Sequence, residues 1–360
     1  LLIIKACVVE EAQVIILDES SAPLTQKDAG ILRNIVLDRR QAGKAIIYIS
    51  HHIDELMDIC DRMTVLRDGR SVATRDKADL THHEISELIV GESFSAEGLR
   101  PHSDVFDGGE DILKLTQLGK WGDFEKIDLT IRRGEIVGLA GLRGSGRTEI
   151  MKAIAGIDPP DEGLIEFKGR KMAFATPDQA LSVGISYLPE EREREGLLKG
   201  FSIRDNITLN CLREISANGI IREKVRRSLT ESIFQAVECK AFSIDQDVDE
   251  LSGGNKQKVL IGRIMALKPD IYLLDEPTKG VDVGAKKSIL SLIIKSIRGN
   301  AGVLMTSPGL DDLIEICDRI VVICKGRIAA THLRADFDEK KIFMDIQGLK
   351  CEEAPNRHLA

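Results

Sequence analysis

Residues 134–148 read GEIVGLAGLRGSGRT and carry the most informative pattern in the sequence. The apolar run 134–140, bounded by glycine, is typical of a buried strand, and apolar residues at helical spacing follow over 148–155. Between them, residues 141–148 follow the pattern GxxxxGK[ST] at all but one position. Glycines in such a loop let backbone N–H groups turn toward a phosphate at the N-terminus of the next helix. The stretch therefore predicts a strand, a phosphate-binding loop and a helix.

Arg147 stands where the pattern has lysine. Arginine keeps the positive charge, but its longer, forked side chain is not equivalent to a compact ammonium. Thr148 supplies a hydroxyl that suits Mg²⁺. The loop thus predicts nucleotide binding rather than fast hydrolysis, with a plain glycine-rich turn as the alternative. The loop residues expected to bind nucleotide are Gly141, Gly144, Ser145, Gly146, Arg147 and Thr148.

Two further patterns lie downstream of the loop. Residues 251–255 read LSGGN and precede an amphipathic helix expected over 257–267. Residues 271–276 read IYLLDE, which is typical of a buried strand that ends in Asp275 and Glu276. An aspartate at such a strand end can hold Mg²⁺, and the next glutamate can polarise an attacking water. Beside a phosphate-binding loop, this pair favours nucleotide hydrolysis over a solvated turn.

The strand that ends in Asp275 recurs near the start of the chain, where residues 14–19 read VIILDE. Asp18 and Asp275 are 257 positions apart (275 minus 18), and the same spacing relates ICDR at 59–62 to ICDR at 316–319. A constant spacing through a strand, a helix and another strand indicates a duplicated domain, and it is too long for a solenoid repeat.

The spacing also predicts how the chain is organised. Lys258 corresponds to residue 1, so everything before it in the second copy has no counterpart. The first copy is expected to be only a C-terminal third, and the chain, which begins at Leu1 rather than Met, a piece of something longer. Alternating strands and helices favour an α/β domain with a largely parallel sheet. The expected parts are the first copy (1–95), a linker (96–110), the second copy (111–332, with a helical subdomain at about 197–258) and a C-terminal tail (333–360).

As a set, these patterns resemble the ABC transporter ATPases, whose signature LSGGQ is similar to LSGGN at 251–255. The resemblance implies a P-loop NTPase fold of the ABC ATPase type, in which two domains sandwich ATP and Mg²⁺. Ser252, Gly253 and Gly254 are then expected to meet the γ-phosphate held by the opposite domain. Glu190 falls at the position of the family's Q-loop glutamine, and the loop that follows is where the family meets its membrane partner.

The family's switch histidine, which contacts the γ-phosphate, falls at His51 in the first copy. Its counterpart in the second copy is Pro308, which has neither a side-chain donor nor a backbone N–H. The resemblance thus implies one competent site and one degenerate site in the parent protein, both incomplete in this chain, so little turnover is expected from the chain alone. It implies catalytic roles for Glu19, His51 and Glu276, and metal binding by Asp18, Thr148 and Asp275.

Arg147, LSGGN, Pro308 and the sequence PEER at 189–192 together resemble the monosaccharide importer ATPases of bacteria, of ribose, galactoside or xylose type. That resemblance implies ATP hydrolysis coupled to sugar uptake through integral-membrane permease subunits. It implies indirect partnership with a periplasmic or extracellular sugar-binding protein, and a peripheral location at the cytoplasmic face of the plasma membrane.

Composition bears on the alternatives. The net charge is −8, so the chain lacks the excess of basic residues expected of a protein that binds nucleic acid. With 43% hydrophobic and 30% charged residues the chain is typical of a folded soluble protein, and no apolar run is long enough to span a bilayer. One alternative is a soluble tandem ABC factor that acts on ribosomes or DNA, a group that normally keeps lysine and histidine in both copies. The other is a pseudo-ATPase that only binds nucleotide.

Overall fold

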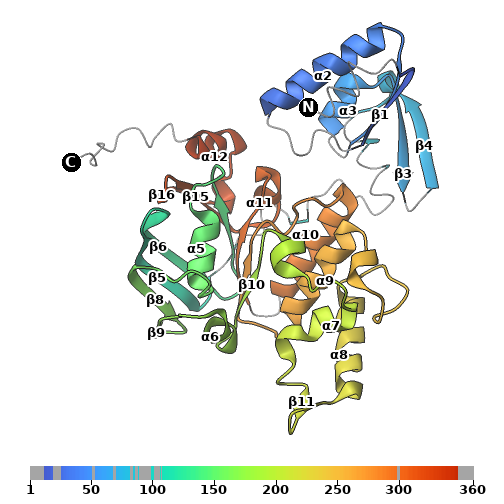
Figure 1. The fold of residues 1–360 in the computed structure, drawn as a ribbon. Coiled ribbons are helices and arrows are strands. Elements are labelled where there is room, and N and C mark those ends of the chain that lie inside the picture. Colours follow the sequence, from blue (N-terminus) through green and yellow to red (C-terminus); the bar gives the residue numbers. More distant parts are fainter. Residues whose placement is uncertain are drawn as a thin grey trace. The chain divides into compact units, whose positions relative to one another are not determined.

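The computed structural model describes residues 12–18, 26–50, 53–67, 70–81, 84–85, 88, 99–100, 106, 108–297 and 301–347. The chain divides into two compact units, one of Leu1–Ala96 with Asp282–Gly284 and one of Glu97–Val281 with Ala285–Ala360. Figure 1 shows both units. In the described part of the chain, no helix combines the length and the apolar character that crossing a bilayer requires.

The larger unit is built on a six-stranded sheet. Its strands run parallel except the last, which is antiparallel to its neighbour. The central strands are buried on both faces, as their continuous apolar sequences require. This confirms the α/β prediction with a largely parallel sheet. The order across the sheet is β10 (Ile185–Leu188), β13 (Ile271–Leu274), β14 (Gly302–Thr306), β7 (Ile136–Ala140), β15 (Arg319–Cys324) and β16 (Arg327–Leu333).

The sequence patterns did not predict a second, antiparallel sheet. Its four strands lie in the order β6 (Phe124–Arg132), β5 (Asp111–Lys120), β8 (Glu162–Phe167) and β9 (Arg170–Met172). Helix α5 (Arg147–Ile154) packs with both sheets, since Ile150 shares one apolar cluster with Leu115 of β5 and Leu139 of β7. Because α5 directly follows the glycine-rich loop, this packing fixes the direction in which the loop presents its backbone.

Helical elements cover the rest of the larger unit. The region expected as a helical subdomain at about 197–258 does contain mostly helices, and in Figure 1 they lie together beside the six-stranded sheet. The elements within it are α7 (Ile203–Thr208), η4 (Leu209–Cys211), the hairpin of β11 (Ser216–Ala217) and β12 (Ile220–Ile221), α8 (Glu223–Ala236) and η5 (Val248–Glu250), with η3 (Arg192–Gly196) before it and α9 (Gly253–Ala266) running past its end. Other helices of the chain are α6 (Pro177–Ser182), α10 (Val283–Ile297) and α11 (Leu310–Ile316).

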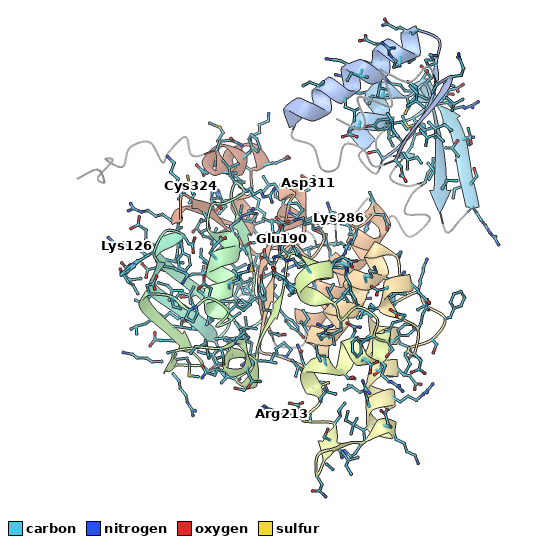
Figure 2. All side chains as sticks on the ribbon, viewed as in Figure 1. Lys126, Glu190, Arg213, Lys286, Asp311 and Cys324 are labelled. Atoms are coloured by element: carbon cyan, nitrogen blue, oxygen red, sulfur yellow. The ribbon has the colours of Figure 1, made fainter. Side chains whose placement is uncertain are left out.

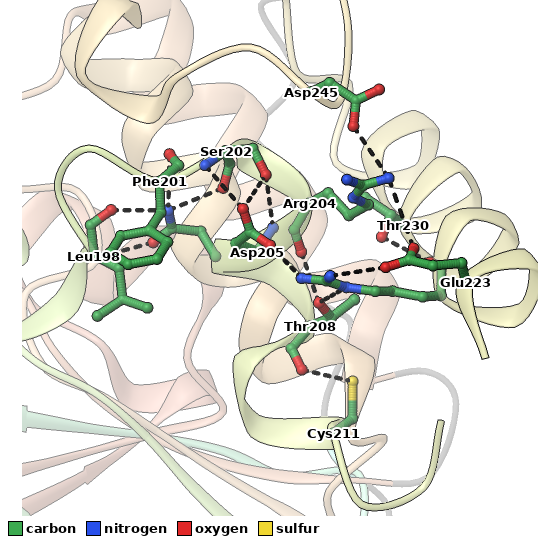
Figure 3. A network of polar contacts seen from close by, with 12 residues as sticks. Leu198, Phe201, Ser202, Arg204, Asp205, Thr208, Cys211, Glu223, Thr230 and Asp245 are labelled. Atoms are coloured by element: carbon green, nitrogen blue, oxygen red, sulfur yellow. Dashed lines mark hydrogen bonds and ion pairs between the residues drawn. The ribbon is translucent and has the colours of Figure 1, made fainter. Parts of the chain in front are cut away.

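A polar network joins α7 to α8, as Figure 3 shows. Buried Arg226 of α8 donates to the Thr208 hydroxyl at 3.0 Å and forms an ion pair with Asp205 of α7. Arg204 of α7 pairs with Asp245 at 3.2 Å. The subdomain is therefore held by charge pairs in addition to its apolar contacts.

The folded unit extends beyond residue 332, which corrects the expectation of a tail from 333. After β16 come η6 (Arg334–Asp336) and α12 (Glu339–Ile346). Ile342 of α12 is fully buried in the cluster formed with the six-stranded sheet, and Asp338 caps the helix by accepting from the N–H of Lys341. The apolar face of α12 is the physical reason, because it packs on the domain rather than remaining in solvent.

Part of the expected linker, 96–110, also packs on this unit. The guanidinium of Arg100 pairs with the buried carboxylate of Asp318 at 2.8 Å, and the carbonyl of Arg100 accepts a hydrogen bond from Arg334. The structured second copy therefore begins before residue 111.

The smaller unit repeats the C-terminal part of the larger one, element by element. Strand β2 (Ala45–Ile49) begins 257 positions before β14, and α3 (Ile53–Ile59) begins 257 positions before α11 (302 minus 45, 310 minus 53). Even the β-bulge after Val65 recurs after Val322. The duplication is thus visible in the structure. The other elements of this unit are β1 (Val14–Asp18), α2 (Gln26–Gln41), β3 (Arg62–Arg67), β4 (Arg70–Asp76) and η2 (Lys77–Asp79).

Candidate nucleotide site

The glycine-rich loop connects the end of β7 to the start of α5, as the sequence predicted. Gly144 and Gly146 have φ angles of 76° and 105°, which residues with a side chain rarely adopt. A Cβ on Gly141 would lie 2.4 Å from the carbonyl oxygen of Ile323. These positions require glycine, and the loop can therefore present backbone N–H groups at the N-terminus of α5.

This loop lines a cavity of about 660 Å³ together with residues from other strand ends. Glu190 follows β10, Glu276 and Lys279 follow β13, and Pro308 follows β14. Parallel strands place their carboxyl ends at one edge of a sheet, and this is where α/β proteins bind ligands. The structure therefore brings most of the predicted residues of the second copy to one site; Figure 2 shows Glu190 near the middle of the larger unit. The lining residues are Gly141 to Glu149, Lys152, Glu190, Glu276, Lys279 and Pro308.

Asp275 lies next to the loop and is fully buried. It accepts hydrogen bonds from Thr306 at 2.7 Å and Thr148 at 3.2 Å through one oxygen, and from Tyr187 at 3.1 Å through the other. Burial and the neighbouring Asp275 raise the pKa of the Tyr187 phenol, so Tyr187 remains a donor. A hydroxyl and a carboxylate side by side are the oxygen ligands that Mg²⁺ takes, so Thr148 and Asp275 fit the predicted metal role.

Glu276 has a strained backbone, with φ at 47°. Its N–H donates to the Thr306 hydroxyl at 2.9 Å, which holds the residue at the strand end. Burial, and next the negative charge of Glu190, raise the pKa of the Glu276 carboxyl. A carboxylate with a raised pKa accepts a proton more readily, which suits the role of a general base.

Pro308 occupies the position of the family's switch histidine, as the sequence indicated. The neighbouring Ser307 donates to buried Asp312 at 2.7 Å, and its carbonyl accepts from Arg147 at 3.5 Å. Arg147 therefore reaches from the loop toward the segment after β14. No side chain at position 308 can bond to a phosphate.

The signature residues Ser252, Gly253 and Gly254 lie at the start of α9 and are not among the residues that line this cavity. The amide of Asn255 donates to the Ser252 hydroxyl at 2.9 Å. Arg192 packs against Gly253, since a Cβ there would lie 2.9 Å from its guanidinium. Arg192 had been noted in the sequence only as part of PEER at 189–192. That the signature serves a loop other than its own domain's stays a prediction.

Comparison with known proteins identifies the family. The profile of the family described as "ABC transporter" matches residues 124–279. The ribose import ATP-binding protein RbsA 2 of Rubrobacter xylanophilus is 38% identical over 355 residues, which are 98% of this chain and 68% of that protein. This chain belongs to the ABC transporter ATP-binding proteins. A ribose import ATP-binding protein RbsA of Chelativorans sp. is 40% identical, over 92% of this chain and 65% of its own length.

Solved structures of ATP-binding cassettes show the same fold as this ABC protein. The structure of an ATP-binding subunit of an ABC transporter covers 66% of the chain with a TM-score of 0.55 and 23% identity. A dimeric cassette in a post-hydrolysis state, bound to ADP and Pi, covers 63% with a TM-score of 0.56 and 22% identity. The curated relatives are longer than the chain, which spans about two thirds of their length.

Of the three site residues predicted in the first copy, the structure describes Asp18. Asp18 ends β1 and is exposed. Glu19 and His51 lie outside the described residues, so their catalytic roles stay predictions.

Trp121 is a candidate that the sequence analysis missed. It lies in the turn between β5 and β6, and its side chain is 80% exposed. The same turn lies beside the glycine-rich loop, because a Cβ on Gly146 would lie 3.0 Å from the carbonyl oxygen of Asp123. Exposed aromatic rings stack on nucleic-acid bases, so Trp121 suits the base of a nucleotide held by the loop. The signal available in the sequence was a lone tryptophan flanked by Lys120 and Gly122.

Proposed function

We propose that the cavity lined by residues 141–149 binds ATP with Mg²⁺. The supporting observation is that the loop, Thr148 and Glu276 line one cavity, with buried Asp275 bonded to Thr148 directly behind it. The loop backbone and the N-terminus of α5 suit phosphates. Thr148 and Asp275 would hold Mg²⁺, which when bound supplies positive charge beside the phosphate oxygens.

We infer that this second-copy site holds nucleotide more readily than it hydrolyses it. Arg147 supplies a cation from the loop, and Glu276 supplies a carboxylate with a raised pKa that can take a proton from water. Pro308 supplies no donor for the γ-phosphate. Catalysis of phosphoryl transfer depends mainly on positioning and charge stabilisation, so the absence of the switch histidine lowers the rate of hydrolysis.

We further propose that the chain is part of an ATP-hydrolysing subunit of a monosaccharide importer. The support comes from the relatives, which are named ribose import ATP-binding proteins, and from the Arg147 and Pro308 departures. Integral-membrane permease subunits would be the direct partners, with the subunit peripheral at the cytoplasmic face. An external sugar-binding protein would be an indirect partner, and the net charge of −8 speaks against nucleic acid.

Nucleotide binding can be tested with the intrinsic fluorescence of Trp121, the only tryptophan in the chain. Mg-ATP should change the fluorescence with saturation, because the base would stack beside the indole. Tripolyphosphate, which has no base, should compete with ATP for the loop without the same fluorescence change. If calorimetry and fluorescence both detect no binding of Mg-ATP, the proposed site is wrong. Steady hydrolysis by this chain alone should stay below about 1 s⁻¹, a low value for an ATP-using enzyme.

The transport role needs a separate test. The chain, joined to the N-terminal part that the relatives have, should co-purify with a sugar permease after co-expression in membranes. Co-purification with ribosomes instead would favour the soluble-factor alternative. Binding of nucleotide without any partner would leave only the pseudo-ATPase role.

A further inference from the structure

Lys279 lines the cavity, and neither the sequence patterns nor the family comparison assigns it a role. Its ammonium forms an ion pair with the Glu190 carboxylate and lies 3.6 Å from a carboxylate oxygen of Glu276. The Lys279 side chain is 45% exposed and that of Glu190 is 29% exposed, so the pair faces the cavity rather than the core. Lys279 thus bridges two carboxylates beside the expected phosphate site.

The backbone of Lys279 is held in place by its neighbours. Its N–H donates to the carbonyl of Glu276 at 3.0 Å. Arg192 donates to the carbonyl of Lys279 at 3.0 Å and to that of Gly280 at 2.9 Å. The turn after β13 is therefore fixed, and only the lysine side chain needs to move to meet a ligand.

The charges of the cavity explain why a cation is needed there. Glu190 places a carboxylate where the family has a neutral glutamine, and Glu276 also lines the cavity, next to buried Asp275. A nucleoside triphosphate is itself strongly anionic and would be repelled. Partial burial acts to lower the pKa of Lys279, but contact with Glu190 raises it overall, so the side chain is charged at neutral pH.

Lys279 also differs from the other cations that line the cavity. Arg143, Arg147 and Lys152 belong to the glycine-rich loop and α5, whose backbone cradles the inner phosphates. Lys279 comes from the segment after β13, near Glu276 and Pro308. The terminal phosphate is the one that extends beyond the loop, so it is the group that Lys279 would meet.

We propose that Lys279 is a specificity-determining residue of this nucleotide site. Its ammonium offsets the Glu190 carboxylate and contacts the terminal phosphate, so that the site prefers a triphosphate over a diphosphate although Pro308 contributes no donor. This inference rests on the proposed function, because it concerns the same cavity.

Calorimetric titration of the 360-residue chain with Mg-ATP and with Mg-ADP tests the proposal. Lys279→Met should weaken ATP binding about tenfold and ADP binding less than about twofold, since opposite charges interact strongly only at short range. Lys279→Arg should keep the preference for ATP. Glu190→Gln should tighten ATP binding, and Glu190→Gln with Lys279→Met should return the ATP affinity close to the wild-type value, because the double change removes one negative and one positive charge.

Lys168→Met is the matched control. Lys168 is 42% exposed and pairs with Asp270, but it does not line the cavity. Its loss should leave both affinities unchanged. Equal weakening of ATP and ADP by Lys279→Met, or no change in either, would overturn the inference while leaving nucleotide binding intact. If the wild type binds neither nucleotide, the proposed function fails as well, so the two failures are distinguishable.

Discussion

The two copies in this chain share their secondary structure but not their burial. Ile16 of β1 is 63% exposed, whereas its counterpart Leu273 in β13 is fully buried at 0%. Ile47 of β2 and Leu304 of β14 differ in the same way. Strand bounds, bulge and helix positions are therefore determined locally, by sequence patterns present in both copies, while burial is not.

Strand β7 explains the difference. In the second copy it lies between β14 and β15 and joins them into one sheet. In the first copy, β1 pairs with β2 and β3 with β4 as separate two-stranded sheets in the part of the chain that the structure describes. In the second copy β7, which also leads into the glycine-rich loop, thus completes the core and the site together.

The largest expected effect concerns catalysis by the two copies. The test uses a longer protein in which this chain is joined to a segment that carries the glycine-rich loop and the signature of the first copy. In it, Glu19→Gln or His51→Ala should lower the rate of ATP hydrolysis about a thousandfold, as loss of a general base does. Glu276→Gln should have a much smaller effect, because its site already lacks a histidine. Ser252→Ala should also lower the rate strongly, since the signature of the second copy would complete the first site. Steady-state ATPase assays measure this, and the opposite order would refute the assignment of the competent site.

The next effect concerns stability at matched positions. Leu273→Ala should lower the free energy of unfolding of the larger unit by about 3 kcal/mol, because it leaves a cavity in a core that is buried on both faces. Ile16→Ala should lower the stability of the smaller unit by less than about 1 kcal/mol, since its side chain is already exposed. Hydrogen exchange of peptides from β13 and β1 in urea reports each unit separately. Equal losses would mean that another surface covers β1 in solution.

A smaller gain is expected from repairing the second site. Arg147→Lys with Pro308→His should raise hydrolysis at that site about tenfold if these side chains are what limits the chemistry. The Glu276→Gln variant of the repaired protein is the control, since it should remove the gain. No gain in the repaired protein would indicate that the Glu190–Lys279 pair, rather than the missing histidine, limits this copy.

The sequence was sufficient for those parts of the fold and site that rest on local patterns. The glycine-rich loop was predicted between a strand and a helix, and Gly144 and Gly146 in it have positive φ angles. Thr148 and Asp275, assigned to the same metal from the sequence, are hydrogen-bonded to each other. Arg263 shows what could not be predicted. An arginine in an amphipathic helix is ordinarily exposed, yet Arg263 is buried and donates to the carbonyls of Gly196 and Asn206. Burial lowers its pKa to about 10. Such long-range partners, like the Lys279–Glu190 pair, follow from tertiary packing and leave no spacing pattern.

The smallest expected effect is a pH dependence of the network that joins α7 to α8 in the second copy. Burial acts to raise the pKa of Asp205, but hydrogen bonds from Ser202 and the charge of Arg226 lower it overall. A carboxyl with a lowered pKa in the folded state stabilises that state above its ordinary pKa, near 4, and the contribution is lost as the pH falls further.

Hydrogen exchange between pH 6 and about pH 3 should therefore show α7 and α8 opening in acid before the first copy's β1 and β2, after correction for intrinsic exchange rates. Asp205→Asn should remove this difference, because its amide has no charge to lose and Arg226 keeps an oxygen acceptor. Glu231→Gln, which removes an exposed partner of Arg227 on the same helix, is the control and should preserve the difference. If Asp205→Asn leaves the opening of α7 in acid unchanged, then Asp205 does not hold α7 to α8.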